Sequence, residues 1–254
     1  MADGLVHYEL ADGVATIVMD RPQAKNALNQ ALREGLWAAF RRFVAEDGAL
    51  VAVLASRGDV FCAGADLKEM AALGLRVPPP DFLPQLGRNL HTDKPVIAAV
   101  QGPAYAGGFA LAQMCDLCVA ADDARFAITE AKWSRGAPWA APLPWLIPPR
   151  VALELIVTAE PLGAERAHAI GLVNRVVPRA RLLEEAQALA RVISRNAPLS
   201  VRAAKRMVYA VAGTSLASAL DEGDRVWQSV YESEDAQEGP RAFREKRAPV
   251  WSGR

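Results

Sequence analysis

Two stretches decide the fold of this chain: Phe61-Cys62-Ala63-Gly64-Ala65-Asp66-Leu67-Lys68 and Gln101-Gly102-Pro103-Ala104-Tyr105-Ala106-Gly107-Gly108-Phe109. Each comes soon after a short apolar run, at residues 50–55 and 96–100, of the kind expected for a strand buried on both faces. Both stretches are therefore predicted to join a strand to a helix. Free backbone N–H groups and a helix dipole at such a junction can meet negative charge. Neither stretch is a P-loop or a dinucleotide fingerprint.

Further strands and helices are predicted on either side of these stretches. Residues 6–10 and 14–19 have the pattern of two strands, joined at Ala11-Asp12-Gly13 by a hairpin turn. Residues 117–121 and 173–177 are further candidate buried strands. A helix is expected from about Asn29, and one of its faces carries the apolar side chains Leu32, Leu36, Phe40 and Phe43. This alternation of strands and helices predicts an α/β core built with right-handed crossovers.

The pattern changes near Pro178, after which apolar residues recur at helical spacing. Helices are expected from about residue 182 to 193, from 198 to 212 and from 216 to 231. We therefore predict a core over residues 1–195 and a helical region over residues 196–254. The proline-rich segment 74–84 is expected to form a loop beside the core.

The composition argues against several classes of protein. The 254 residues carry 29 Lys and Arg and 29 Asp and Glu, so there is no basic excess and nucleic acid is not an expected partner. The N-terminus, Met1-Ala2-Asp3-Gly4, lacks a secretory pattern, and no apolar run is long enough to span a membrane. These features predict a soluble, cytoplasmic protein without a membrane partner.

The cysteines and histidines do not suggest a metal site. Cys115 and Cys118 form one C-x-x-C pair without the second pair that a zinc site needs, and Cys62 stands apart. We interpret these cysteines as small apolar core residues in a reducing compartment. No metal or redox cofactor is therefore expected.

Taken together and in this order, the two stretches resemble the enoyl-CoA hydratase/isomerase (crotonase) family. The resemblance begins at Arg21-Pro22-Gln23-Ala24-Lys25-Asn26-Ala27-Leu28 and covers most of the chain. Segments 147–149, 171–177 and 233–247 look most like its crotonobetainyl-CoA (carnitinyl-CoA) hydratase branch. The resemblance implies an α/β spiral of β-β-α units with a C-terminal helical trimerisation region. It also implies a homotrimer or a dimer of trimers.

The resemblance further implies an acyl-CoA thioester substrate, with coenzyme A present only as part of that substrate. The N–H groups of Ala65 and Gly107 would form an oxyanion hole, in which two preoriented donors stabilise the enolate oxygen. Residues that would contact coenzyme A are Lys25, Ala63, Ala65, Asp66, Leu67, Lys68 and, reaching a neighbouring subunit's ligand, Phe243 and Lys246. The alternative for these lysines is a solvated surface charge.

The acids of the family are matched only in part. Hydratases of this family use two glutamates, and the later one corresponds to Glu130, whereas the earlier position holds Ala110. Alanine can neither hold a water nor move a proton. Family members that shift a double bond from the 3- to the 2-position work with a glutamate at the Glu130 position alone. Glu130 is therefore the predicted acid/base, and the alternative is that it pairs structurally with a neighbouring cation.

The resemblance and this departure together leave three candidate functions. Double-bond isomerisation is favoured over efficient hydration, because one glutamate suffices for it. A carnitinyl-CoA-type hydratase or dehydratase is the first alternative, and an inactive acyl-CoA binder or assembly subunit is the second. The segment after Glu130 contains Trp133, Arg135 and Trp139, which would reshape the acyl pocket or stack on a ring or quaternary amine. The alternative is that these three are core and rim residues without ligand contact.

Overall fold

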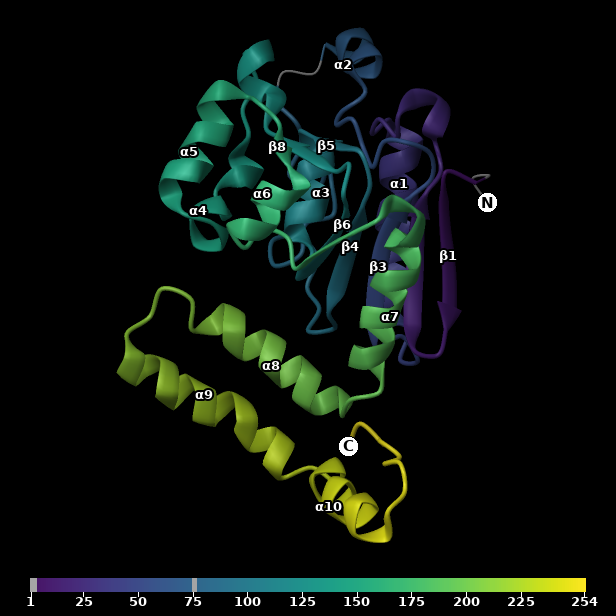
Figure 1. The fold of residues 1–254 in the computed structure, drawn as a ribbon, viewed down its shortest axis with the longest axis vertical. Helices are drawn as coiled ribbons and strands as arrows, with labels where there is room; N and C mark the ends of the chain where they lie inside the picture. Colours follow the sequence, from purple (N-terminus) through teal and green to yellow (C-terminus); the bar gives the residue numbers. More distant parts are fainter. Residues whose placement is uncertain (1–3, 75–76) are drawn as a thin grey trace.

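Residues 4–74 and 77–254 are described by a computed structural model (Figure 1). Their larger sheet has the strand order β1-β2-β3-β4-β6-β9, in which β1 runs antiparallel to β2 and all later neighbours run parallel. The predicted hairpin and the buried strands at 50–55, 96–100 and 117–121 are confirmed. The candidate buried strand at 173–177 is shorter than predicted and is not buried, because β9 lies at the edge of the sheet, with Arg175 exposed and both valines partly buried. The N-terminal residues 1–3 lie outside the described part. The strands are β1 (Val6–Ala11), β2 (Val14–Met19), β3 (Val51–Ser56), β4 (Val96–Val100), β6 (Leu117–Ala121) and β9 (Arg175–Val177).

A second, three-stranded sheet was not predicted. It consists of β5 (Pro103–Tyr105), β7 (Arg125–Ala127) and β8 (Leu162–Gly163), with β7 in the centre. Strands of two or three residues are too short to produce a recognisable alternation of apolar and polar residues. Since β5 lies inside the second quoted stretch, that stretch is not a simple strand-to-helix junction. It crosses to the smaller sheet before its helix begins.

Helices cover both faces of the larger sheet. Successive side chains of β3 point to opposite faces, so Val51, Val53 and Ala55 pack with α7 (Leu182–Ser194). Ala52 and Leu54 point to the opposite face of the sheet. There they pack in a second group of buried residues, together with α1 (Gln30–Ala45) and α3 (Gly107–Met114). The predicted apolar face of α1 is confirmed, because its four named residues are fully buried. This double coverage explains why the central strands are apolar at nearly every position.

The remaining core helices are short. The α4, α5 and α6 helices lie beside the smaller sheet, whereas α2 begins at the end of the first quoted stretch and lies at the top of the view (Figure 1). Single turns of 3-10 helix are interspersed. These elements are α2 (Leu67–Leu73), α4 (Leu143–Leu146), α5 (Pro149–Thr158), α6 (Ala164–Ala169) and the turns η1 (Pro22–Ala24), η2 (Thr129–Trp133), η3 (Pro138–Ala140) and η4 (Arg179–Arg181).

The C-terminal helices extend away from the core. They are α8 (Pro198–Ala210), α9 (Leu216–Tyr231) and α10 (Asp235–Glu245), and Figure 1 shows them in a group separate from the sheets. Asp116 connects α8 to the core, because its carboxylate accepts hydrogen bonds from Lys205 Nζ at 2.8 Å and Tyr209 OH at 2.9 Å. The predicted helices are confirmed, while a domain boundary at residue 195 stays a prediction.

Candidate active site

The two quoted stretches meet at a cavity of about 1220 Å³. The first stretch contributes five residues to its wall and the second contributes Ala106 and Gly107. Glu130, on η2, lies on the same wall. The structure thus places most of the predicted site residues around one space: Lys25, Ala63, Ala65, Asp66, Leu67, Lys68, Gly107 and Glu130.

Close packing at Gly64 brings the two stretches together. Gly64 has a φ of +95°, and a Cβ there would lie 2.8 Å from Ala106 Cβ and 3.4 Å from Gly107 N. Glycine is therefore needed both for the backbone conformation and for the close approach. The Gly64 carbonyl also accepts a hydrogen bond from Leu28 N at 2.8 Å, which joins this stretch to the Arg21–Leu28 segment.

The N–H groups of Ala65 and Gly107 have no hydrogen-bond partner among the described residues. Gly107 is the first residue of α3, where no intrahelical acceptor is available. Ala106, just before it, has φ +50° and ψ −121°, and its own N–H donates to Ala127 O at 2.9 Å. The unusual ψ of Ala106 sets the plane of the peptide that carries the Gly107 N–H. Strain of this kind is characteristic of functional sites.

Glu130 is a largely buried carboxyl group. Burial raises its pKa above the usual glutamate value, and a hydrogen bond from Trp139 partly opposes that rise. Trp139 Nε1 donates to Glu130 Oε1 at 2.9 Å, whereas Oε2 is buried without a partner in the described part of the chain. The structural alternative, an ion pair with a neighbouring cation, is not found among the residues that the structure describes: Lys132 instead pairs with Glu160 at 3.1 Å.

Asp66 lines the same cavity, but its pKa is lowered, whereas that of Glu130 is raised. A hydrogen bond from Arg21 lowers the pKa of its carboxyl group, and the ion pair measures 2.8 Å. Asp66 also caps α2 by accepting the N–H groups of Lys68 and Glu69. Its side chain is therefore occupied in holding the first stretch in place.

Sequence reasoning missed the role of Asn26 in supporting this site. The fully buried Asn26 donates to Arg57 O at 2.9 Å and to Val60 O at 2.7 Å, and it accepts from Arg21 N at 2.8 Å. These bonds tie the Arg21–Leu28 segment to the chain leading into the first stretch. The sequence carried no signal for this role, because the burial that requires an asparagine to be hydrogen-bonded is seen only in the structure.

Several cations surround the cavity. Lys25 and Lys68 line it as predicted, and Arg21, Arg88 and Arg135 line it in addition. Phe243 and Lys246 lie at α10 and do not line this cavity in their own chain. Phe243 is 87% exposed, so it is available to another molecule. The predicted contact of these two residues with a neighbouring subunit's ligand stays a prediction.

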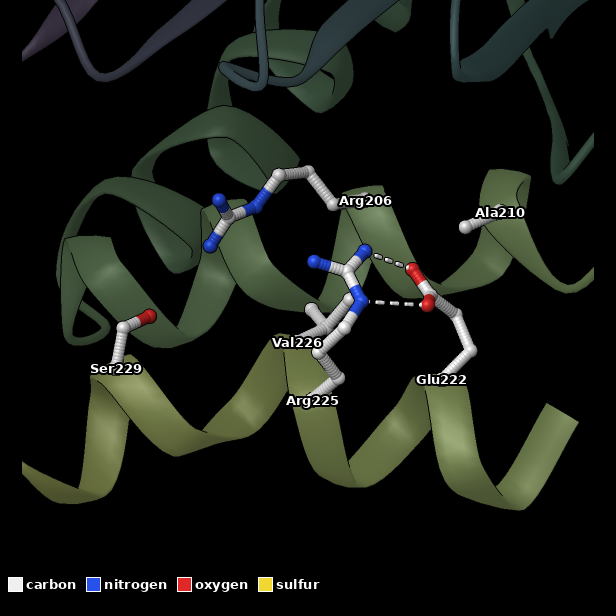
Figure 2. Close-up of a pocket in the computed structure, with 6 residues that line it drawn as sticks. All are labelled: Arg206, Ala210, Glu222, Arg225, Val226 and Ser229. Atoms are coloured by element: carbon white, nitrogen blue, oxygen red, sulfur yellow. Dashed lines mark hydrogen bonds and ion pairs between the residues drawn. The ribbon is translucent and has the colours of Figure 1, made fainter. Parts of the chain in front are cut away.

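A smaller cavity of about 480 Å³ lies between α8 and α9. Figure 2 shows that its glutamate, Glu222, is paired with Arg225, whose Nε lies 2.7 Å from Glu222 Oε2. This pairing lowers the pKa of Glu222. None of the predicted site residues lines this cavity, and its only carboxylate is poorly suited to take up a proton. The larger cavity is therefore the candidate active site.

The profile of a family described as enoyl-CoA hydratase/isomerase matches residues 9–254, which is nearly the whole chain. The chain belongs to the enoyl-CoA hydratase/isomerase family. It is thus an acyl-CoA enzyme of the hydratase/isomerase type, as the two stretches predicted.

Curated relatives agree with this membership of the enoyl-CoA hydratase/isomerase family. The chain is 39% identical to a carnitinyl-CoA dehydratase of Salmonella typhi, and 98% of each chain is covered. It is 38% identical to the carnitinyl-CoA dehydratase of Escherichia coli strain K12, again over 98% of both chains. The predicted likeness to the carnitinyl-CoA branch is confirmed.

Solved structures agree on the fold. An enoyl-CoA hydratase from Mycobacterium tuberculosis H37Rv is 40% identical, with a TM-score of 0.90 over 98% of this chain and 99% of the other. The enoyl-CoA hydratase EchA1 from Mycobacterium marinum is 39% identical, with a TM-score of 0.88 and the same coverage. The predicted α/β fold of the crotonase type is confirmed.

Two features are absent from residues 4–74 and 77–254. No helix there is long and apolar enough to cross a membrane. No group of three or more His, Cys, Asp or Glu side chains there is placed to hold a metal ion.

Proposed function

We propose that this enzyme shifts the double bond of an enoyl-CoA thioester and hydrates such thioesters slowly. The supporting observation is that only two carboxylates, Asp66 and Glu130, line the described part of the cavity. Asp66 is paired with Arg21 and has a lowered pKa, so it is a poor proton carrier. Glu130 has a raised pKa and no ion pair with Lys132, whose partner is Glu160. One acid/base residue therefore serves this site.

The proposed reaction moves one proton. Glu130 removes a proton from C2 of a 3-enoyl thioester, and the electron pair delocalises onto the thioester oxygen. The N–H groups of Ala65 and Gly107 stabilise that enolate oxygen, each contributing about 3–4 kcal/mol to lowering the barrier. The protonated Glu130 then returns the proton to C4, which leaves the double bond between C2 and C3. No water enters the reaction.

The missing first glutamate supports isomerisation over hydration. Ala110 is 5% exposed and is not among the residues that line the cavity. Hydration needs a water held against C3 and a second proton transfer, which a paired-carboxylate site supplies. A methyl group at position 110 supplies neither.

The names of the relatives favour a second function, a carnitinyl-CoA-type dehydratase. In that reaction Glu130 would remove the C2 proton and deliver it to the departing C3 hydroxyl. A catalytically inactive acyl-CoA-binding or assembly subunit is the third candidate, motivated by Ala110 alone. The free amides and the buried Glu130 argue against it.

Assays on crotonyl-CoA and on 3-hexenoyl-CoA test the proposal. Isomerisation of 3-hexenoyl-CoA should exceed hydration of crotonyl-CoA, and Glu130→Gln should reduce isomerisation about 10²- to 10⁴-fold. Fast hydration of crotonyl-CoA that Glu130→Gln abolishes would refute the isomerase proposal. Binding without turnover of any enoyl or hydroxyacyl thioester would support the inactive subunit. Ala110→Glu, the companion variant, should raise hydration if holding the water is the missing function.

The proposed function also includes the binding of coenzyme A and the assembly of the chains into an oligomer. The cations Lys25 and Lys68 on the cavity wall suit the phosphates of coenzyme A, which would enter only as part of the substrate. Phe243 and Lys246 would contact the nucleotide of a neighbouring subunit's ligand. We propose a homotrimer or a dimer of trimers working in the cytoplasm.

A further inference from the structure

Trp139 is the only side-chain hydrogen-bond partner of Glu130 among the described residues. Its indole N–H donates to Glu130 Oε1 at 2.9 Å, and the other carboxylate oxygen has no partner. A carboxylate with a single side-chain donor is held in one orientation while its charged form stays only partly stabilised. This arrangement suits a base whose carboxylate must be held in one orientation and must still be able to take up a proton.

Trp139 is itself held by α3. Gln113 Nε2 donates to the backbone carbonyl of Trp139 at 2.9 Å. The Phe109 ring packs edge-on against the indole, with the ring centroids 5.7 Å apart. Both residues belong to the helix that begins at Gly107. The same helix thus carries one proposed oxyanion donor and fixes the residue that contacts the proposed base.

We propose that Trp139 is a positioning residue, which orients the Glu130 carboxylate toward the substrate and sustains its charged form through the indole N–H. This inference rests on the proposed function, since it needs Glu130 to be the base. Trp139 transfers no proton: the indole N–H remains in place while the C2 proton moves to Glu130 and back.

Two of the charged groups near Glu130 are paired with other residues. On η2 itself, Lys132 pairs with Glu160 at 3.1 Å. On α5, which packs against η2, Glu154 pairs with Arg166 at 2.7 Å. The other charged side chains on these segments and the following turn are Arg135, which lines the cavity, and the exposed Arg150.

Proton exchange at C2 of butanoyl-CoA in D2O tests the proposal, because it needs the base and the oxyanion hole but neither isomerisation nor hydration. Trp139→Phe keeps an aromatic ring and removes the donor. Its exchange rate and its kcat for 3-hexenoyl-CoA should fall about 10- to 100-fold with little change in KM. The acidic limb of its pH profile should move to higher pH, because the charged carboxylate loses its donor. The matched control is Trp145→Phe, since Trp145 is 81% exposed on α4 and lies outside the cavity wall.

Gln113→Met provides a second variant that leaves the indole in place. It removes only the bond to the Trp139 carbonyl, so it should produce a smaller loss of rate and the same direction of pH shift. Circular dichroism checks that each variant is folded. An unchanged or downward-shifted acidic limb in Trp139→Phe, or equal losses in Trp145→Phe, would overturn the role of Trp139. Wild-type exchange without isomerisation would instead refute only the isomerase proposal, and absence of any wild-type exchange would overturn both.

Discussion

At the scale of single residues, Glu130 combines reactivity with a cost in stability. Burial raises its pKa, so the folded protein binds this proton more tightly than the unfolded chain does. The free energy of unfolding therefore falls as the pH rises from about 4.5, the usual glutamate value, through the raised pKa of the folded state. Above that pH range, burial of the ionised Glu130 therefore lowers the free energy of unfolding.

Glu130→Gln should accordingly stabilise the protein at pH 7 while removing activity. The amide oxygen can still accept from Trp139 Nε1, and no charge has to be buried. Urea unfolding of wild type and variant at several pH values measures the difference. It should be largest at neutral pH and shrink as the pH falls toward 4.5, the usual glutamate value. A variant less stable than wild type at pH 7 would contradict this prediction.

The same carboxyl group predicts the pH dependence of activity. Glu130 must be ionised to remove a proton, so kcat/KM should fall on the acidic side at a pH above the usual glutamate value of 4.5. Asp66, whose pKa is lowered by Arg21, should not contribute to that limb. A pH–rate profile of 3-hexenoyl-CoA isomerisation checks this, and a limb at or below 4.5 would argue against a buried base.

At the scale of elements, the approach of the two stretches depends on Gly64. Gly64→Ala places a Cβ 2.8 Å from Ala106 Cβ at a backbone φ of +95°. Strain and overpacking together should destabilise the protein by about 2–5 kcal/mol. Activity should fall further than the folded fraction, since the amides of Ala65 and Gly107 are pushed apart.

Gly74→Ala, at the end of α2, is the control for Gly64→Ala. Its φ of +57° is also left-handed, but among the described residues a Cβ there meets nothing within 4 Å. It should cost about 1–2 kcal/mol and leave kcat unchanged. Urea unfolding and the isomerisation assay measure both variants. Equal effects of the two substitutions would show that the close approach at Gly64 is unimportant.

At the scale of the whole molecule, the C-terminal helices present apolar side chains to the outside. Exposed examples on these helices and the segments beside them are Val208, Tyr209, Leu216, Leu220, Tyr231, Phe243 and Val250. So many exposed apolar residues on one region are characteristic of an interface between subunits. This is the structural support for the proposed trimer.

Phe243→Ala and Lys246→Ala should therefore raise the KM for acyl-CoA with kcat unchanged. An increase of about tenfold corresponds to a loss of about 1.4 kcal/mol of binding. Val250→Ala, which alters a 76% exposed residue of the same region, is the control. Light scattering should give a mass of three or six chains for each protein. A monomeric wild type, or unchanged KM in both variants, would contradict the shared site.

Prediction from the sequence succeeded where local patterns are long. The hairpin, the buried strands and the apolar face of α1 follow from alternation and helical spacing, which a single segment displays by itself. It failed for β5, β7 and β8, because strands of two or three residues are stabilised by their neighbours. Asn26 and Trp139 were missed in their roles for a related reason. Their partners lie at distant positions or across a turn, which no local pattern reveals.

The order of residues by itself determined the family, the α/β class, the two stretches with their candidate amides and the substitution of Ala110 for an acid. Only the tertiary structure decided which of the two carboxylates on the cavity wall is reactive. Asp66 and Glu130 are both acids in the sequence, but Asp66 lies beside Arg21, whereas Glu130 is largely buried and has the Trp139 indole as its side-chain donor. Ionisation depends on desolvation and on the charges within a few ångströms, and both are properties of packing.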